Sequence, residues 1–128
     1  MTAENADTDI HHIVLDFGGT DFTWLEGQNV GVLPPGTLDN GHTHHMRAYS
    51  IASDRDGETT GTQEMALTVK RVIDMWEGKP YHGVASNFLC DLNAGDSVHC
   101  VGPIGDRFLM PQDPAVRIMM ICTGTGIA

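Results

Sequence analysis

Short apolar stretches alternate with polar, glycine-rich stretches along the whole chain. Within most apolar stretches the hydrophobic residues recur at every second position, the period of a β-strand with one buried face. The strands predicted in this way cover residues 10–17, 28–33, 47–53, 64–73 and 97–101. Because Gly, Pro, Asn and Asp turns separate them, we expect an all-β fold, an antiparallel Greek-key β-barrel, with a sandwich as the alternative.

Two segments between these strands have other patterns. Trp76-Glu77-Gly78-Lys79-Pro80 has the composition of a hairpin tip. Residues 87–92 have the spacing of one short helix, and Ser86 just before them is a typical N-cap. Free backbone N–H groups at a helix start that follows a glycine can bind an anion, so we expect a pyrophosphate here; the alternative is that Ser86 only caps its own helix.

The last segment differs because its apolar run is continuous. Residues 116–122 are typical of a strand buried on both faces, as in a parallel sheet, and Thr123-Gly124-Thr125-Gly126 follows as a glycine-rich turn. We therefore expect a polar tail at 1–9, the barrel at 10–114, and at 115–128 the first strand of a truncated α/β nucleotide-binding domain. On this interpretation the chain is a fragment of a longer protein.

Composition excludes several classes of partner. The 128 residues carry a formal charge of −10, which argues against nucleic acid and anionic membrane surfaces. No apolar run approaches the ~20 residues that span a bilayer, and the N-terminus lacks a signal-peptide pattern, so we expect a cytoplasmic protein. Three widely spaced cysteines without a Cys-x-x-Cys pair exclude an iron–sulfur or zinc site built from this chain alone and predict buried free thiols.

Histidines cluster before the third predicted strand, at His42, His44 and His45. Imidazoles close together can bind a metal, but no carboxylate or cysteine arrangement accompanies them. We interpret them, and likewise His11 and His12, as solvated side chains and predict no metal site.

The third predicted strand carries the most informative chemistry. Alternation places Arg47 and Tyr49 on one face, where a guanidinium can hold a phosphate and a phenol ring can stack on a heterocycle. Ser50 adds a hydroxyl, although alternation turns it away from Tyr49 unless the strand twists or ends there. The plain alternative is that Arg47 is a solvated edge residue and Tyr49 a core residue. In the next strand Thr68 and Lys70 share a face, and Lys70 is either a phosphate contact or a solubilising lysine.

Five blocks of sequence together resemble the ferredoxin–NADP reductase family. Arg47-Ala48-Tyr49-Ser50 followed by Ile51-Ala52-Ser53 is similar to its flavin-binding signature, and the other blocks occur in the family's order and spacing: residues 67–71, 83–92, 102–105 and 122–128. Ala85 and the segment Met119-Met120-Ile121-Cys122 most resemble the members that serve as reductase component of bacterial benzoyl-CoA oxygenase. Two residues depart from plant-type members: Ala85 stands where these often carry Cys, and Ala48 where they carry Leu.

The resemblance implies a barrel that binds FAD, takes hydride from NADPH or NADH, and passes single electrons to an iron–sulfur ferredoxin domain or an oxygenase component. Arg47, with Ala48 beside it, would hold the pyrophosphate, and Tyr49 and Ser50 would act at the flavin ring, Ser50 near N5. The remaining cofactor contacts implied are Thr68, Val69 and Lys70 on the adenosine side, Gly83, Val84, Ala85 and Ser86 at the phosphates, and Thr123 and Thr125 facing the flavin from the domain junction.

Two other functions stay open at this point. The chain is alternatively the barrel of a diflavin reductase, which shares Arg-x-Tyr-Ser, or a cofactor-free barrel that serves as a docking module. The acidic composition also disfavours docking of a separate acidic ferredoxin through this face. An electron-transfer centre on the same polypeptide would remove that difficulty.

Overall fold

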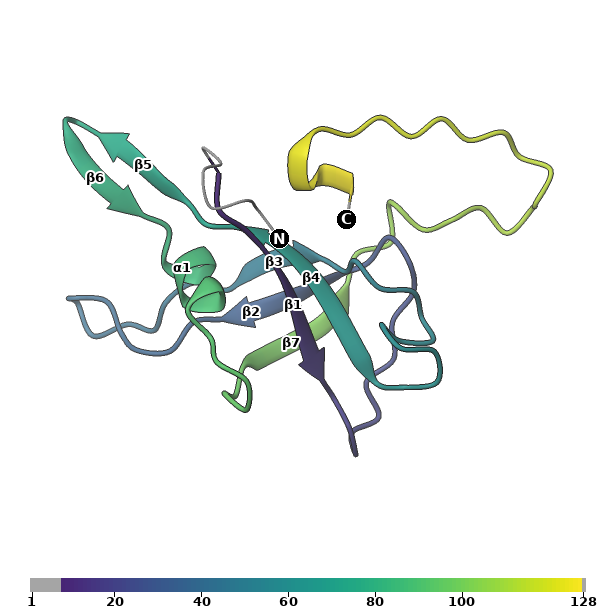
Figure 1. The fold of residues 1–128 in the computed structure, drawn as a ribbon, viewed down its shortest axis with the longest axis horizontal. Coiled ribbons are helices and arrows are strands. Elements are labelled where there is room, and N and C mark those ends of the chain that lie inside the picture. Colours follow the sequence, from purple (N-terminus) through teal and green to yellow (C-terminus); the bar gives the residue numbers. More distant parts are fainter. Residues whose placement is uncertain (1–7, 128) are drawn as a thin grey trace.

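The computed structural model describes residues 8–127, and within them the chain forms mostly short strands and one α-helix (Figure 1). The elements are β1 (Ile10–Asp16), β2 (Asn29–Leu33), β3 (Arg47–Ser50), β4 (Glu64–Lys70), β5 (Ile73–Trp76), β6 (Lys79–His82), α1 (Val84–Cys90), β7 (His99–Ile104) and the 3₁₀-helix η1 (Gly124–Ile127). The expected all-β fold with one short helix is confirmed.

Within residues 8–127 all strand pairs are antiparallel, and they form three small sheets. β1 pairs with β4, β2 lies between β3 and β7, and β5 pairs with β6 as a hairpin that projects from the body of the protein (Figure 1). A single bridge between Ile51 and Leu67 connects the end of β3 to β4. This bridge brings the first two sheets around a shared core.

The core forms between these two sheets because each contributes one apolar face. Met65, Leu67 and Val69 of β4 and Val30 and Val32 of β2 are almost completely buried. Leu89 and Cys90 of α1 belong to the same core. Trp24 is also buried in it, and its indole N–H donates to the carbonyl of Asp54 at 2.8 Å. The period-two pattern of the sequence therefore identified most of the buried face correctly.

Several predicted strand boundaries are wrong. The strand expected over 47–53 ends at Ser50, and the one expected from residue 97 starts at His99. The strand expected over 64–73 ends at Lys70, and Ile73 starts the projecting hairpin with 59% of its surface exposed rather than facing the core. The strand expected to end before Gly102-Pro103 continues to Ile104, because the register of its pairing with β2 shifts at this point. Such an irregularity tolerates a residue without an N–H.

The predicted hairpin tip is confirmed between β5 and β6. Glu77 and Gly78 both have positive φ, 49° and 75°, as a two-residue hairpin turn of type I′ requires. Trp76, at the end of this hairpin, is 72% exposed.

The start of the helix differs from the prediction. Gly83, not Ser86, is the N-cap residue, and Ser86 lies inside the first turn, buried. The Ser86 hydroxyl makes a long-range contact instead of a cap: it accepts the backbone N–H of Val72 at 3.1 Å. Val84, the first residue of the helix, is 46% exposed.

The region after β7 is more exposed than the sequence indicated. Phe108, Leu109 and Met110 form an apolar stretch after β7, yet Phe108 is 81% exposed. Residues 116–122 form no strand, and Cys122 is exposed rather than buried; it is free, as are Cys90 and Cys100. A strand of a parallel sheet needs a neighbour on each side to satisfy its backbone, and within residues 8–127 this segment pairs with none.

Two searches of residues 8–127 complete the description of the fold. No helix among them has the length and hydropathy to cross a membrane. In the same part of the chain no three His, Cys, Asp or Glu side chains are grouped as metal ligands.

Candidate functional site

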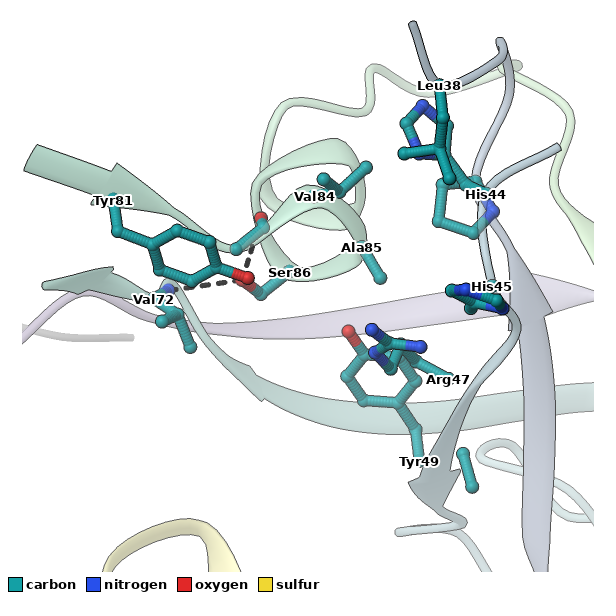
Figure 2. A pocket seen from close by; sticks show the side chains of 13 residues that line it. Leu38, His44, His45, Arg47, Tyr49, Val72, Tyr81, Val84, Ala85 and Ser86 are labelled. Atoms are coloured by element: carbon teal, nitrogen blue, oxygen red, sulfur yellow. Dashed lines mark hydrogen bonds between the residues drawn. The ribbon is translucent and has the colours of Figure 1, made fainter. Parts of the chain in front are cut away.

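A groove of about 510 Å³ lies between β3 and the turn that leads into α1 (Figure 2). Three parts of the chain meet there: the loop between β2 and β3, the strand β3, and the segment that carries the hairpin and the helix start. The residues that line the groove are Pro34, Leu38, His44, His45, Arg47, Ala48, Tyr49, Val72, Tyr81, Gly83, Val84, Ala85 and Ser86.

Although the chain as a whole is acidic, the described side chains that line the groove include basic residues and no acidic ones. Arg47, His44 and His45 line it, whereas no Asp or Glu is present among its described lining residues. The whole sequence has a formal charge of −10, so a groove without carboxylates is a marked local departure. Such a site favours an anionic ligand.

Arg47 and Tyr49 reach the groove because they are two residues apart on β3, paired with Val32 and Val30 of β2. Tyr49 is partly buried against the core and still lines the groove; burial raises the pKa of its phenol, with Cys90 adding to the rise and Arg47 opposing it. Arg47 donates to the carbonyl of Met46 at 3.2 Å and, among the ion pairs within residues 8–127, pairs with no carboxylate. Tyr49 is therefore both a core residue and a groove residue, so the two alternatives given for it from the sequence both apply.

The opposite wall is the tight segment Gly83–Ser86. A β-carbon at Gly83 would lie 2.8 Å from the Ser86 Oγ and 2.9 Å from the Val72 Cβ, so only glycine fits there. The Ser86 hydroxyl donates to the Gly83 carbonyl at 3.2 Å and accepts the Val72 N–H, which leaves the backbone N–H groups as the donors of this wall. Because α1 has only seven residues, its dipole adds little, and the charge of Arg47 has to provide most of the attraction for an anion.

Six of the residues predicted as site residues do not line this groove: Ser50, Thr68, Val69, Lys70, Thr123 and Thr125. Ser50 lies on the other face of β3, as alternation requires, and its hydroxyl donates to Asn29 Oδ1 at 3.3 Å. The side chain of Val69 is buried in the core, so only its backbone is accessible to a ligand. Lys70 is exposed at the end of β4.

Comparison with known proteins identifies the family. Residues 2–108 match the family described as oxidoreductase FAD-binding domain. The chain belongs to this family. Its relatives include the ferredoxin–NADP reductase of Spirulina sp, 39% identical over 130 residues that cover 100% of this chain and 44% of the relative. The chloroplastic ferredoxin–NADP reductase of Spinacia oleracea is 43% identical over 129 residues, which cover 100% of this chain and 35% of the relative.

Solved structures support the fold assignment. Ferredoxin–NADP⁺ reductase from Plasmodium falciparum superposes with a TM-score of 0.64 at 23% identity, covering 85% of this chain and 37% of that chain. At this identity the likeness concerns the fold. The chain spans less than half the length of these relatives.

Sequence reasoning missed several residues of the groove in this FAD-binding domain. The histidine loop was interpreted as solvated, yet His44 and His45 line the groove. A signal was present: positions 45, 47 and 49 alternate, so a strand reading extended by two residues would place His45 beside Arg47 and Tyr49. Tyr81 lies on the hairpin, and in Figure 2 it stands on the far side of Ser86 from Arg47 and Tyr49. Tyr81 reaches the groove only because of where the β5–β6 hairpin lies in the folded protein, which the sequence pattern does not predict.

The lining residues fit the flavin nucleotide for which the family is named. FAD carries two phosphates and two flat ring systems, and the groove offers a guanidinium without a carboxylate partner among the described residues, backbone N–H groups, and the aromatic rings of Tyr49 and Tyr81. Tyr81 is 52% exposed, so part of its ring is free to contact a ligand. Guanidinium and amide donors bind phosphate, and phenol rings stack on heterocycles.

Proposed function

We propose that this chain is the FAD-binding part of an NAD(P)H-dependent reductase that delivers electrons to an iron–sulfur ferredoxin. The observation that supports it most is the groove that brings Arg47 and Tyr49 opposite the segment Gly83–Ser86, in a chain of the FAD-binding family. Bound FAD supplies the redox chemistry, since it accepts a hydride and releases electrons singly.

In this proposal the protein binds and orients the cofactor. Arg47 holds the pyrophosphate together with the backbone N–H groups of Val84, Ala85 and Ser86, and Tyr49 stacks on the flavin ring. The Gly83 N–H is bonded to the Val72 carbonyl, so Gly83 contributes through its small size. Ser50 lies on the other face of β3, at the end of the strand, so it would reach the ring edge only where the flavin extends past that end. Tyr81 provides a second aromatic surface at the other end of the groove.

The sites outside the groove belong to the same proposal. Thr68, the backbone of Val69, and Lys70 would contact the adenosine part, and Thr123 and Thr125 would approach the flavin from the junction with a second domain. η1, which carries Thr125, contacts β4, and this places the end of the described chain beside the strand of Thr68 and Lys70. The segment from residue 115 onward would then belong to the start of a nucleotide-binding domain, although residues 116–122 form no strand here.

The electron acceptor is proposed from the relatives, which are named ferredoxin–NADP reductases. A placement in the benzoyl-CoA oxygenase subgroup, with an oxygenase component as acceptor, is supported only by Ala85 and the segment 119–122. We also propose a cytoplasmic location from the composition alone. Measuring electron transfer from the full reductase to a ferredoxin and to an oxygenase component separates the two acceptors.

FAD titration of the chain tests the proposed binding site. We expect Arg47→Ala to weaken FAD binding by about tenfold or more, because a hydrogen bond to a charged group contributes roughly 1.5–3 kcal/mol. Tyr49→Ala should weaken it as well, whereas Tyr49→Phe keeps the ring and most of the affinity. Arg107→Ala, which removes an exposed arginine outside the groove, is the matched control.

Two results would contradict the proposal. If the wild-type chain binds no FAD, a cofactor-free docking barrel becomes the better interpretation. If Arg47→Ala and Arg107→Ala bind FAD equally well, the groove is not the phosphate site. Far-UV circular dichroism of each variant confirms that the comparison is made between folded proteins.

A further inference from the structure

A network of hydrogen bonds behind the groove wall connects the end of β4 to the start of α1. The Gly83 N–H donates to the Val72 carbonyl at 2.9 Å, and the Val72 N–H donates to the Ser86 hydroxyl at 3.1 Å. Neither Arg71 nor Asn87 lines the groove, yet both belong to this network. The position of the wall therefore depends on side chains that a ligand in the groove would not contact.

Asn87 is the centre of this network. Its Nδ2 donates to the carbonyls of Gly83 and Val72, at 2.8 and 2.9 Å, and its Oδ1 accepts from Arg71 Nη1 at 3.1 Å. The arginine therefore determines which end of the amide is oxygen and turns the two amide hydrogens toward the carbonyls. Aspartate has the same shape, but it would place an oxygen against two carbonyl oxygens.

Arg71 is itself held by carboxylates on its outer side. Its Nε donates to Asp9 Oδ2 at 2.7 Å and its Nη1 to Asp91 Oδ1 at 2.8 Å. The Arg71 side chain is only 18% exposed, whereas that of Asp91 is 67% exposed. The contact with Asp91 is thus a solvent-exposed ion pair of small energy, and the contact with Asn87 is the inner one.

The Gly83 carbonyl oxygen accepts three hydrogen bonds. It accepts from the Asn87 backbone N–H at 3.0 Å, from Asn87 Nδ2 at 2.8 Å and from the Ser86 hydroxyl at 3.2 Å. The C=O and N–H groups of a trans peptide point in opposite directions, so holding the Gly83 carbonyl also fixes the direction of the Val84 N–H. Val84 lines the groove.

From this geometry we infer that Asn87, oriented by Arg71, is a positioning residue that aligns the backbone N–H groups of Val84, Ala85 and Ser86 for the phosphates of the bound nucleotide. The inference rests on the proposed function, because it assigns those donors to FAD. A purely structural role would weaken the binding of every ligand. A positioning role predicts that replacing Asn87 lowers the affinity for ligands with phosphates and leaves the affinity for a ligand without them unchanged.

The test compares FAD with riboflavin, which has the same ring system and no phosphate. In Asn87→Leu the amide donors are gone while the volume is kept, and we expect FAD to bind about tenfold more weakly, with riboflavin affinity changed less than about twofold. The ratio of the two dissociation constants is thus the readout. Asp91→Asn is the matched control, since it removes the outer partner of the same arginine and should leave the ratio unchanged.

A second variant keeps the inference testable if Asn87→Leu does not fold. Arg71→Gln leaves the Asn87 donors in place but removes the group that orients them, so FAD affinity should fall by a few-fold and riboflavin affinity should not. An unchanged ratio in whichever of the two variants folds, or an equal loss for both ligands, overturns the inference. If the wild type binds FAD, such a result leaves the proposed function intact; if the wild type binds no FAD, the proposed function itself has failed.

Discussion

Replacing Gly83 by alanine should destabilise the protein by crowding rather than by backbone strain. Gly83 has φ −64° and ψ 117°, a conformation that any residue adopts, so an added methyl group meets no conformational penalty. The new Cβ would instead lie 2.8 Å from the Ser86 Oγ and 2.9 Å from the Val72 Cβ. The second contact is rigid because a Cβ cannot rotate away, so the wall segment or the end of β4 must move.

The size of the effect follows from these contacts. Overpacking of this kind typically costs 1–3 kcal/mol, and rotation of the Ser86 hydroxyl would also remove the partner of the Val72 N–H, a hydrogen bond worth about 1 kcal/mol. We therefore expect Gly83→Ala to lower the free energy of unfolding by about 2 kcal/mol. The same movement would displace the groove wall and weaken FAD binding in parallel.

Urea denaturation followed by circular dichroism measures this change. Gly126→Ala is the matched control, because it also has an ordinary φ and its added Cβ would meet its nearest neighbour, the Cys122 Cβ, only at 4.0 Å. We expect the control to change stability by less than about 0.5 kcal/mol. Equal stabilities for the two variants would refute the argument that Gly83 is required by close packing.

Three further predictions concern other parts of the molecule. Tyr81→Ala should weaken FAD binding by a few-fold, and Tyr81→Phe should not, since a stacked ring contributes about 0.5–1.5 kcal/mol; equal titrations for both variants would exclude a ring contact. The Arg55 guanidinium lowers the pKa of Glu26 from its ordinary 4.5 to about 2. The small stabilisation of wild type relative to Glu26→Gln should therefore be complete above pH 4.5 and shrink as the pH falls toward 2. A stability difference that does not change with pH in urea denaturation would contradict this. Cys122 is exposed, whereas Cys90 is buried and desolvation raises the pKa of its thiol, so a thiol reagent should label Cys122 fastest, and Cys122→Ser should remove that fast phase.

The strands were predictable from sequence because alternation is a local property. Each inward side chain of β4 sits two positions from the next, and the buried series Met65, Leu67 and Val69 follows directly from it. The same rule failed at Ile73, where alternation continues in the sequence but the chain has already left the sheet. At this point the Val72 N–H is bonded to the Ser86 hydroxyl, fourteen positions away, a contact that no local pattern encodes.

In the candidate site, too, the residues that a local pattern identifies were predicted, and those that depend on tertiary contacts were not. Arg47 and Tyr49 were found because two residues on one strand share a face. The segment Gly83–Ser86 was predicted as a phosphate site from its glycine and helix-start pattern and from the family resemblance. The role of Ser86 was misread, because the rule that serine caps helices is local, whereas here its hydroxyl accepts a distant backbone N–H. Tyr81 could not be found, since it reaches the groove only through the position of the β5–β6 hairpin.

The distribution of ion pairs explains how an acidic protein can present a site for an anion. Arg55 is paired with Glu26, and Arg71 with Asp9 and Asp91, so these arginines are already neutralised by neighbouring carboxylates. Arg47 has no such partner among the described residues, and the groove around it contains no acidic side chain. A phosphate that approaches Arg47 therefore does not have to displace a carboxylate first, and the full charge-assisted hydrogen bond is available to it. The net charge of −10 lies elsewhere on the chain, and it is the local pairing rather than the total that decides what this groove can bind.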